Sequence, residues 1–417
     1  MTTDIRMRPI AYLNSEYPSL SHTFIEREVR HLRELGVDVR TFSARRTSAT
    51  SAPGETNAAA AAATVALQDG ALSTVMSTLV AAASRPAGFI RAIAASQRLS
   101  PGGLAARLRH AAYAAQGAIL ARHLRRIGVE HVHVHMANNG AAIAMMACEV
   151  DPDLSYSLSI HGSAEFFHVD SWTLAPKVER AEFVRCISHF CKAQVMTWTD
   201  PDAWRRFHIV RCGIDPRAFA PRPEREPGPL RLLTVGRLHP IKGYNVLLEA
   251  CRLLADRRVP FELVMVGDGP MSSRLGEAVD RLGLGGHVTF AGGVPQERIQ
   301  SHFDRADAMV VSSFMEGVPV VLMEAMAKEL GVVATRVGGI GELVSHGESG
   351  WLVDAGSAES LAEGIRRYAA DPELCRTHGR QGRRRVIELH DIRDSATAMA
   401  ELFRGRVAHR EQERKAA

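Results

Sequence analysis

The feature that most constrains this chain is an alternation of short apolar segments with amphipathic helical segments. Segments such as 230–235 and 261–266 are mostly apolar, with three polar residues among their twelve, and helical spacing of apolar residues fills the intervals, as in 244–254. Near-continuous apolar strands between helices are typical of a parallel sheet covered on both faces. The alternation occurs in two runs within 417 residues, a length that exceeds a single ordinary core.

The two runs predict an α/β fold with two Rossmann-like, doubly wound parallel-sheet domains that face each other across a cleft. Residues 216–229 carry five prolines, which favour a linker. We therefore expect a first domain over 1–215 and a second over 230–390. A helix over 391–408 is expected to cross back to the first domain, followed by a disordered charged tail over 409–417.

Within the first domain, the pattern is less regular. Residues 43–65 are rich in Ser, Thr and Ala and predict a mobile loop or a weak helix. Residues 70–127 predict helices that break near Pro86 and again at Pro101-Gly102-Gly103. Strands are expected again over 129–135 and 155–160.

Composition excludes some classes of protein. The net charge of +5 is a mild basic excess, which suits anionic partners without reaching the density of a nucleic-acid binder. No secretory signal and no apolar run of about 20 residues is present. Six scattered cysteines without zinc spacing predict reduced thiols in the cytoplasm.

Two glutamates eight residues apart mark the most informative segment, 311–327. A parallel strand is expected to end at Ser312, a loop carries Glu316, and a helix begins near Pro319 and carries Glu324. The backbone N–H groups of Gly317 and Val318 at the helix start favour anions and ligand oxygens. A loop carboxylate can accept hydrogen bonds from sugar hydroxyls, and a second carboxylate two turns later can hold a ribose diol. The alternative is a helix cap at Glu316 and a solvated Glu324.

Two cations lie five residues apart in the loop after another strand. The strand 232–235 ends in Gly236, and Arg237 and Lys242 follow. Arg can bind a phosphate with two hydrogen bonds, while Lys adds a point charge. Together they could offset the charge of a leaving nucleoside diphosphate. The alternative is two surface cations.

Histidines end two expected strands of the first domain. His161 follows 155–160 and is expected to point into the cleft, where it could bind the donor sugar or a phosphate. His133 and His135 have a metal-like spacing, but strand alternation puts them on one face without a third convergent ligand. We therefore interpret both as structural residues and expect no metal site.

These motifs resemble the retaining glycosyltransferase family 4, which has the two-Rossmann GT-B fold. The matching residues are the Glu-x7-Glu pair Glu316 and Glu324, and the Gly-Arg-Leu…Lys-Gly motif of Arg237 and Lys242. The resemblance implies that Arg237 and Lys242 bind the donor diphosphate, Glu316 the sugar, Glu324 the ribose, and His161 the sugar side of the first domain. Val294 would then lie near the base.

The segment 17–25 is similar to a narrower group, the bacterial exopolysaccharide transferases of the colanic-acid type. Ser19, Ser21 and Thr23 would be its acceptor-side residues, although His22 stands where the group has Glu. Glu329 and Gly331 also depart from the family, which typically has Gly and Pro at these turn positions. We expect altered loop strain there.

The sequence therefore predicts a retaining hexosyltransferase that uses a nucleoside diphosphate sugar as substrate and needs no cofactor. Its acceptor would be a sugar-containing or lipid-linked hydroxyl, with no nucleic acid as partner. Two alternatives stay open: a nucleotide-sugar epimerase of similar fold and a non-catalytic sugar-nucleotide-binding subunit. Five arginines between 107 and 126 form either a solvated face or a peripheral docking surface for anionic lipid at the inner face of the membrane.

Overall fold

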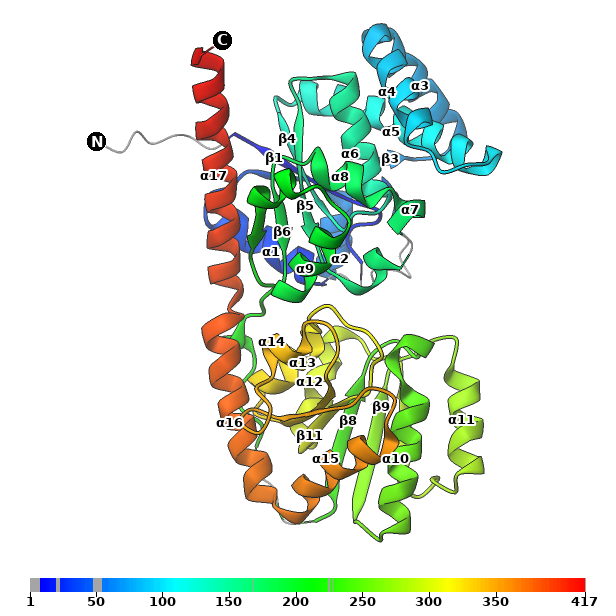
Figure 1. Cartoon of the computed structure of the whole chain (residues 1–417), viewed down its shortest axis with the longest axis vertical. Helices are drawn as coiled ribbons and strands as arrows, with labels where there is room; N and C mark the ends of the chain where they lie inside the picture. The colour runs from blue at the N-terminus through cyan, green and yellow to red at the C-terminus, as the bar shows by residue number, and fades with distance from the viewer. Residues whose placement is uncertain are drawn as a thin grey trace, which may run out of the picture. The chain divides into compact units, whose positions relative to one another are not determined.

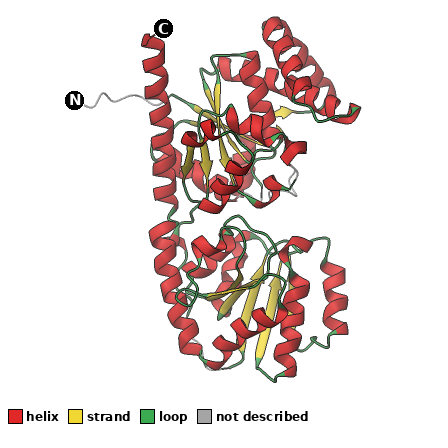
Figure 2. Cartoon of the chain, in the orientation of Figure 1, coloured by secondary structure: helices red, strands yellow, loops and turns green. Residues whose placement is uncertain are grey.

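The computed structural model describes residues 8–19, 23–47, 55–167, 169–223, 226 and 228–416. The chain divides into two compact units. Unit 1 comprises residues 1–210 and 393–417, and unit 2 comprises residues 211–392. Helices cover both faces of a central sheet in each unit, as the ribbons show (Figures 1 and 2).

Unit 1 is built on a seven-stranded sheet in the order β3-β2-β1-β4-β5-β6-β7, in which all described pairs are parallel. Its strands are β1 (Ile10–Asn14), β2 (Val39–Arg45), β3 (Val65–Gln68), β4 (His131–His135), β5 (Ser155–Ile160), β6 (Val184–Cys186) and β7 (Phe207–Ile209). The helices are α1 (Thr23–Glu34), α2 (Glu55–Ala62), α3 (Ala71–Ser84), α4 (Pro86–Arg98), α5 (Leu104–Arg126), α6 (Asn139–Val150), α7 (Val169–Trp172), α8 (Leu174–Glu179) and α9 (His189–Thr197). Every residue of the central strands β1, β4 and β5 is buried, so the core of unit 1 lies on both faces of the middle of the sheet.

Unit 2 has a six-stranded parallel sheet in the order β10-β9-β8-β11-β12-β13. Its strands are β8 (Leu230–Val235), β9 (Phe261–Val266), β10 (Val288–Gly292), β11 (Ala308–Val311), β12 (Gly331–Thr335) and β13 (Trp351–Val353). The helices are α10 (Tyr244–Asp256), α11 (Ser272–Arg281), α12 (Gln296–Arg305), α13 (Val320–Ala327), α14 (Ile340–Leu343), α15 (Ala358–Ala370) and α16 (Pro372–Leu389).

The last helix, α17 (Ile392–Ala416), returns to unit 1. Its buried residues Met399, Ala400 and Phe403 join the core of Tyr12 and Phe183. The Phe403 ring lies 5.7 Å from the Phe183 ring and 6.3 Å from the Tyr12 ring. The helix therefore completes the core of unit 1 after the chain has left that unit.

Three expectations about organisation need correction. The stretch 43–65, predicted as a mobile loop or a weak helix, does contain the short helix α2, but the edge strand β3 that begins at Val65 is not predicted. The tail predicted to be disordered over 409–417 continues α17 to Ala416, because its Glu, Gln, Arg and Lys residues are good helix formers. The boundary between the units falls after Val210, and part of the predicted linker, Pro216–Ala218, forms a 3-10 turn of unit 2.

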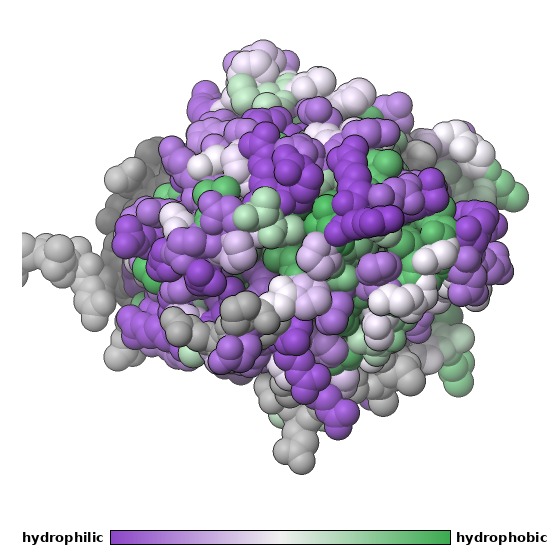
Figure 3. All heavy atoms as spheres, turned by 90° about the horizontal axis from the view of Figure 1, so that it is seen from below, coloured by the Kyte–Doolittle hydropathy of each residue, from purple (hydrophilic) through white to green (hydrophobic). Residues whose placement is uncertain are grey.

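The surface of the molecule is mostly polar on the face seen from below the orientation of Figure 1. Polar side chains cover most of that face, with smaller apolar areas between them (Figure 3). No helix among the described residues is long and apolar enough to cross a membrane.

Glu329 occupies a backbone conformation that usually needs glycine. Its φ of 61° is left-handed, and it ends α13 in a Schellman motif, since Glu329 N donates to Met326 O and Leu330 N to Ala325 O. A side chain at this position strains the backbone. Gly379 packs against the same turn, where a Cβ at 379 would lie 2.0 Å from Glu329 O.

We expect Glu329→Gly to stabilise the protein by about 0.5–1 kcal/mol, because glycine removes the left-handed strain. The weak pair of Glu329 Oε1 with Arg383 Nε, 3.9 Å apart, offsets little of this gain. Urea unfolding measures the change. Glu329→Ala is the control, because it removes the same ion pair but keeps a Cβ. An equal gain from alanine would contradict the backbone explanation.

Candidate active site

The sheet of unit 2 has one point at which the direction of strand addition reverses. From β8 the chain adds β9 and β10 on one side, and then returns to place β11 on the other side. The loops after β8 and β11 therefore leave the same edge in opposite directions. Such a divergence opens a crevice at the carboxyl ends of the strands, where α/β sheets bind ligands.

The two loops at this point bring Lys242 and Glu316 together. Lys242 Nζ lies 2.6 Å from Glu316 Oε1, and Ser313 Oγ donates to the same oxygen at 2.6 Å. Glu316 is almost fully buried, while the side chain of Lys242 is 28% exposed. Of the residues predicted for the donor site, these two thus form a direct ion pair that is open to solvent on the lysine side.

Two hydrogen bonds to backbone oxygens hold the two loops together beside this pair. Ser312 Oγ donates to Lys242 O at 2.8 Å, and Phe314 N donates to Ile241 O at 2.8 Å. Gly243 has a φ of 64°, and a Cβ there would lie 2.1 Å from Ser312 O. Only glycine permits this approach, so the glycine that follows Lys242 is needed to hold the lysine beside Glu316.

A second glycine, Gly338, allows the loop after β12 to pack closely against the backbone of the loop that carries Glu316. Gly338 has a φ of 54°, and a Cβ there would lie 1.7 Å from Glu316 O. Gly339 N donates to Gly317 O at 2.8 Å. The backbone of Glu316 is thereby fixed from both sides, which orients its carboxylate before any ligand binds.

The other donor-binding residues predicted in the second domain also lie in unit 2. Arg237 is exposed in the loop after β8, and it has no ion-pair partner within the part of the chain that the structure describes. Gly236 precedes it, and Gly317 and Val318 lead into α13. Glu324 is buried on α13, and Val294 is partly buried after β10. Their roles stay predictions.

In unit 1 the reversal of strand order lies between β1 and β4. The loop after β4 contains Met136, whose φ of 70° is unusual for a residue with a side chain. Glu165 holds this loop against the loop after β5, because its carboxylate accepts from Ala137 N at 2.6 Å and from His161 N at 2.7 Å. Lys177 Nζ donates to Ala137 O at 3.0 Å. Sequence reasoning missed both residues, although Glu165 follows His161 by only four positions.

The ring of His161 is held from two sides. His135 Nδ1 lies 2.9 Å from His161 Nε2, and the Phe24 ring lies 4.7 Å from the His161 ring. Behind His135, Glu28 pairs with Arg185 and accepts from Tyr12 at 2.9 Å. Although burial raises the pKa of Glu28, Arg185 and His135 hold that pKa well below its usual range.

The histidines of β4 need one correction. They lie on one face, as predicted, but a third residue does converge: ligand atoms of Glu28, His133 and His135 lie within 4.8 Å of one another. Both ring nitrogens of His133 already bond the hydroxyls of Ser157 and Ser159 at 2.8 Å. The Arg185 guanidinium already forms an ion pair with the Glu28 carboxylate. A divalent metal ion would therefore have to displace this guanidinium.

The acceptor-side residues predicted in unit 1 are only partly described. Ser19 lies in the loop after β1, and Thr23 is the first residue of α1. Both are partly buried. Ser21 and the substituted His22 lie outside the described residues. The predicted acceptor role of these residues stays a prediction.

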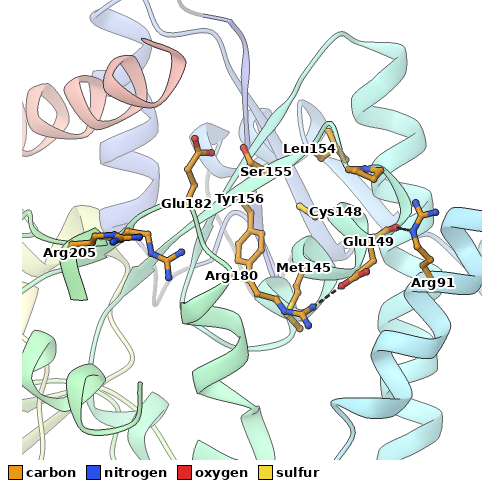
Figure 4. A pocket seen from close by; sticks show the side chains of 12 residues that line it. Arg91, Met145, Cys148, Glu149, Leu154, Ser155, Tyr156, Arg180, Glu182 and Arg205 are labelled. Atoms are coloured by element: carbon orange, nitrogen blue, oxygen red, sulfur yellow. Dashed lines mark hydrogen bonds and ion pairs between the residues drawn. The ribbon is translucent and has the colours of Figure 1, made fainter. Parts of the chain in front are cut away.

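A separate cavity of about 800 Å³ lies in unit 1. Its charged lining residues are Arg91, Glu149, Arg180, Glu182, Arg205 and Arg206, and Arg180 pairs with Glu149 at 2.7 Å (Figure 4). Ser155 at the start of β5 also lines it, whereas His161 follows the end of that strand. Because β5 spans the sheet, the cavity lies at the edge opposite to His161 and includes none of the predicted site residues.

Comparison with known proteins identifies the family. The family model for "Glycosyl transferases group 1" matches residues 217–385. Alpha-maltose-1-phosphate synthase of Mycolicibacterium smegmatis is 31% identical over 267 residues, which cover 57% of this chain and 67% of that protein. This chain belongs to the group 1 glycosyl transferases. The predicted resemblance to family 4 is thereby confirmed.

One of the similar proteins belongs to colanic acid biosynthesis, the narrower group that the segment 17–25 resembles. WcaL of Escherichia coli (strain K12), assigned to colanic acid biosynthesis, is 38% identical over 168 residues, or 39% of this chain. The chain spans 41% of the length of WcaL in this match.

Solved structures of similar shape support the predicted fold. Sucrose-phosphate synthase from Thermosynechococcus elongatus has a TM-score of 0.75 at 20% identity, covering 96% of this chain and 100% of that one. HepE of Anabaena in complex with UDP-glucose has a TM-score of 0.70 at 16% identity, covering 95% of this chain and 99% of that one. The two-sheet GT-B architecture predicted from the sequence is confirmed.

Replacing the loop-bridging carboxylate should weaken unit 1. Glu165→Gln exchanges one of two accepting oxygens for an amide, which leaves a backbone N–H without its partner. We expect a loss of about 1–3 kcal/mol in the free energy of unfolding at pH 4.5, where the Glu165 carboxyl keeps its proton. Thermal and urea unfolding measure it, and Asp170→Asn, at an exposed carboxylate of α7, is the control for loss of a carboxyl group. A stability unchanged by Glu165→Gln would contradict the bridging role.

The same variant tests a pH dependence. Burial raises the pKa of Glu165 to about 7, above the value of 4.5 for an ordinary glutamate. The folded state therefore binds this proton more tightly than the unfolded chain, so its contribution to stability is full below pH 4.5 and is lost as the pH rises to 7. Wild type should lose stability relative to Glu165→Gln across that window. A constant difference between them from pH 4.5 to 7 would count against this.

Proposed function

We propose that this chain is a retaining glycosyltransferase that moves a hexosyl group from a nucleoside diphosphate sugar to an acceptor hydroxyl. The observation that carries the proposal is the Lys242–Glu316 ion pair at the strand-order reversal of unit 2. Membership of the glycosyl transferase family supports it. A UDP-hexose is the first donor to test, since HepE, of similar fold, is seen with UDP-glucose.

The charges around this pair suit a diphosphate. Without ligand, Lys242 and Glu316 neutralise each other, while the neighbouring Arg237 has no counter-charge among the residues described. A bound diphosphate would recruit Arg237 and Lys242 together and release the Glu316 carboxylate to accept from hydroxyls of the sugar. Because two cations balance the leaving group, the proposal includes no metal and no other cofactor.

We assign the remaining roles by the same chemistry. Glu324 would hold the ribose diol, Gly236, Gly317 and Val318 would donate or make room at the phosphates, and Val294 would lie beside the base. In unit 1, His161 would contact the sugar, and Ser19, Ser21 and Thr23 would contact the acceptor. The bond from the anomeric carbon to the phosphate oxygen breaks while the acceptor oxygen bonds to that carbon on the same face. The acceptor proton passes to the leaving diphosphate.

The acceptor and compartment belong to the same proposal. We propose a sugar-containing or lipid-linked acceptor in polysaccharide or glycolipid synthesis, in keeping with the similarity to WcaL. None of the six cysteines, all of which the structure describes, is in a disulfide, and five of them are buried, which fits a reducing cytoplasm. Peripheral contact with the inner face of a membrane, expected from the basic helices of unit 1, also stays a proposal.

Two substitutions test the site. Lys242→Ala should lower kcat/KM for donor turnover by about 10²–10³-fold, as expected when a group that stabilises the leaving charge is removed. Glu316→Gln should lower it by at least tenfold while leaving binding of the free nucleoside diphosphate nearly unchanged, because the sugar contact alone is weakened. Nucleoside diphosphate release measures turnover, and calorimetry measures binding.

Arg252→Ala is the matched control, because Arg252 is an exposed cation of unit 2 that pairs with Asp256 at 3.0 Å on α10. Rates unaffected by both site substitutions would reject the assignment. Donor conversion without any acceptor would instead support an epimerase, and tight donor binding without turnover would support a binding subunit. An inverted anomeric product, read by NMR, would contradict retention.

A further inference from the structure

Helix α3 presents its apolar face to solvent. Leu72, Val75, Met76, Leu79 and Val80 follow the spacing i, i+3, i+4, i+7, i+8, which places them on one face of the helix. All five are exposed, Leu72 to 78% and Leu79 to 59%. A surface helix in water normally turns such a face toward the core, so α3 is oriented opposite to the usual arrangement.

The face that α3 turns toward the protein is small and polar. Thr74, Ser77 and Thr78 are partly buried, and Ala81 is fully buried. Thr74 and Thr78 donate their hydroxyl protons to backbone oxygens of the preceding turn, Gly70 O at 2.7 Å and Thr74 O at 2.8 Å. The polar groups are thus satisfied within the helix, and the inner face makes a close, small-residue contact while the large side chains remain outside.

The apolar surface continues onto the helices that pack against α3, which are α4 and α5 and which lie together with it in Figure 1. Ile90 on α4 is exposed, and Leu104 and Leu108 in the first turns of α5 are 75% and 64% exposed. Of the 16 exposed large hydrophobic residues among those described, 8 lie between positions 72 and 108. Such concentration marks an interaction surface rather than scattered exposure.

The segment that forms these helices carries charge of a single sign, although Arg85, just before α4, is already paired with Asp151 at 2.9 Å. Between Asp69 and Glu130 the chain holds eight arginines and no acidic residue. Arg98, Arg107 and Arg109 are exposed and form no ion pair within the described part of the chain. Arg107 lies between Leu104 and Leu108 on one face of α5. Apolar and cationic side chains therefore share one set of helices.

We propose that the apolar face of α3 docks on the surface of an anionic phospholipid bilayer. A lipid surface accepts both components, since apolar side chains enter the acyl boundary while arginines meet the headgroup phosphates. A second copy docked by the same face would bring its exposed Arg98, Arg107 and Arg109 toward those of the first copy, without an acidic residue in the segment to meet them. Charge complementarity thus favours an anionic surface over self-association.

The docking face lies near the edge of unit 1 that carries His161. All strands of the sheet are parallel, so β3 and β5 end at the same edge, and α3 begins three residues after β3 ends. β3 and β5 are four positions apart in the sheet, or roughly 19 Å at the usual strand spacing. This distance, taken along the sheet, separates the start of α3 from the strand that leads to His161, so a lipid-linked acceptor, if the proposed function holds, would approach His161 from that side.

The test is flotation of the full-length protein with vesicles, which reads binding and does not depend on transfer activity. We expect binding to vesicles of phosphatidylcholine with 30% phosphatidylglycerol, and at least tenfold weaker binding to phosphatidylcholine alone. Raising the salt from about 50 to 300 mM should weaken binding. Leu72→Ser with Leu79→Ser should weaken it at least tenfold, since two large apolar side chains no longer enter the bilayer.

Ile387→Ser is the control, because Ile387 is an exposed apolar residue of α16 in unit 2, 45% exposed. It should bind vesicles as wild type does, and all variants should keep the wild-type melting temperature. Arg107→Gln with Arg109→Gln should reduce the preference for anionic vesicles several-fold. The proposal is overturned if wild type binds neither vesicle, if Leu72→Ser with Leu79→Ser binds as wild type does, or if light scattering without lipid shows a dimer that this variant dissociates.

Discussion

The arrangement of the candidate site depends on where each parallel sheet reverses its strand order. In unit 2 the reversal places the loops after β8 and β11 side by side, and Gly243 and Gly338 allow the close approach at which Lys242 and Glu316, 74 residues apart, lie 2.6 Å from each other. Neither residue is positioned by its own helix or strand interior. Their chemistry therefore depends on a global property of the sheet, and local substitutions in the helices would leave it intact.

Gly243 and Gly338 hold the loops around Lys242 and Glu316 in fixed positions. A side chain at Gly243 or Gly338 would collide with a backbone oxygen of the Glu316 loop, so neither loop could close on its neighbour. In unit 1, charged side chains hold the loops instead of glycines. Glu165 and Lys177 form hydrogen bonds with the backbone of the loops after β4 and β5. Both devices fix the loops in advance, which lowers the cost of ordering them when a ligand binds.

How much the sequence predicts follows from the range of the interactions involved. Strands β5, β8 and β9 are predicted with their observed bounds, and the expected end of β11 at Ser312 and start of α13 near Pro319 are each within one residue of the structure. Burial on both faces requires mostly apolar residues in β8 and β9, which makes these strands visible in the local sequence. The edge strand β3 was missed, since half-exposed Val-Ala-Leu-Gln carries no such run. The continuation of α17 to Ala416 is not predicted, because a short, strongly charged sequence is compatible with both a helix and a disordered tail.

The buried polar contacts of unit 1 could not be predicted from spacing. Arg185 reaches Glu28 across 157 positions, and Glu28 completes the group with His133 and His135 only because α1 packs over β4. The periodicity of apolar residues predicts which face of a helix or strand is buried, but it does not predict which other element packs against that face. The inverted orientation of α3 has the same origin: its stripe predicts an amphipathic helix, while the direction in which the stripe points is decided by the small residues beneath it. An element whose local pattern and tertiary placement disagree is most economically explained by a contact outside the chain.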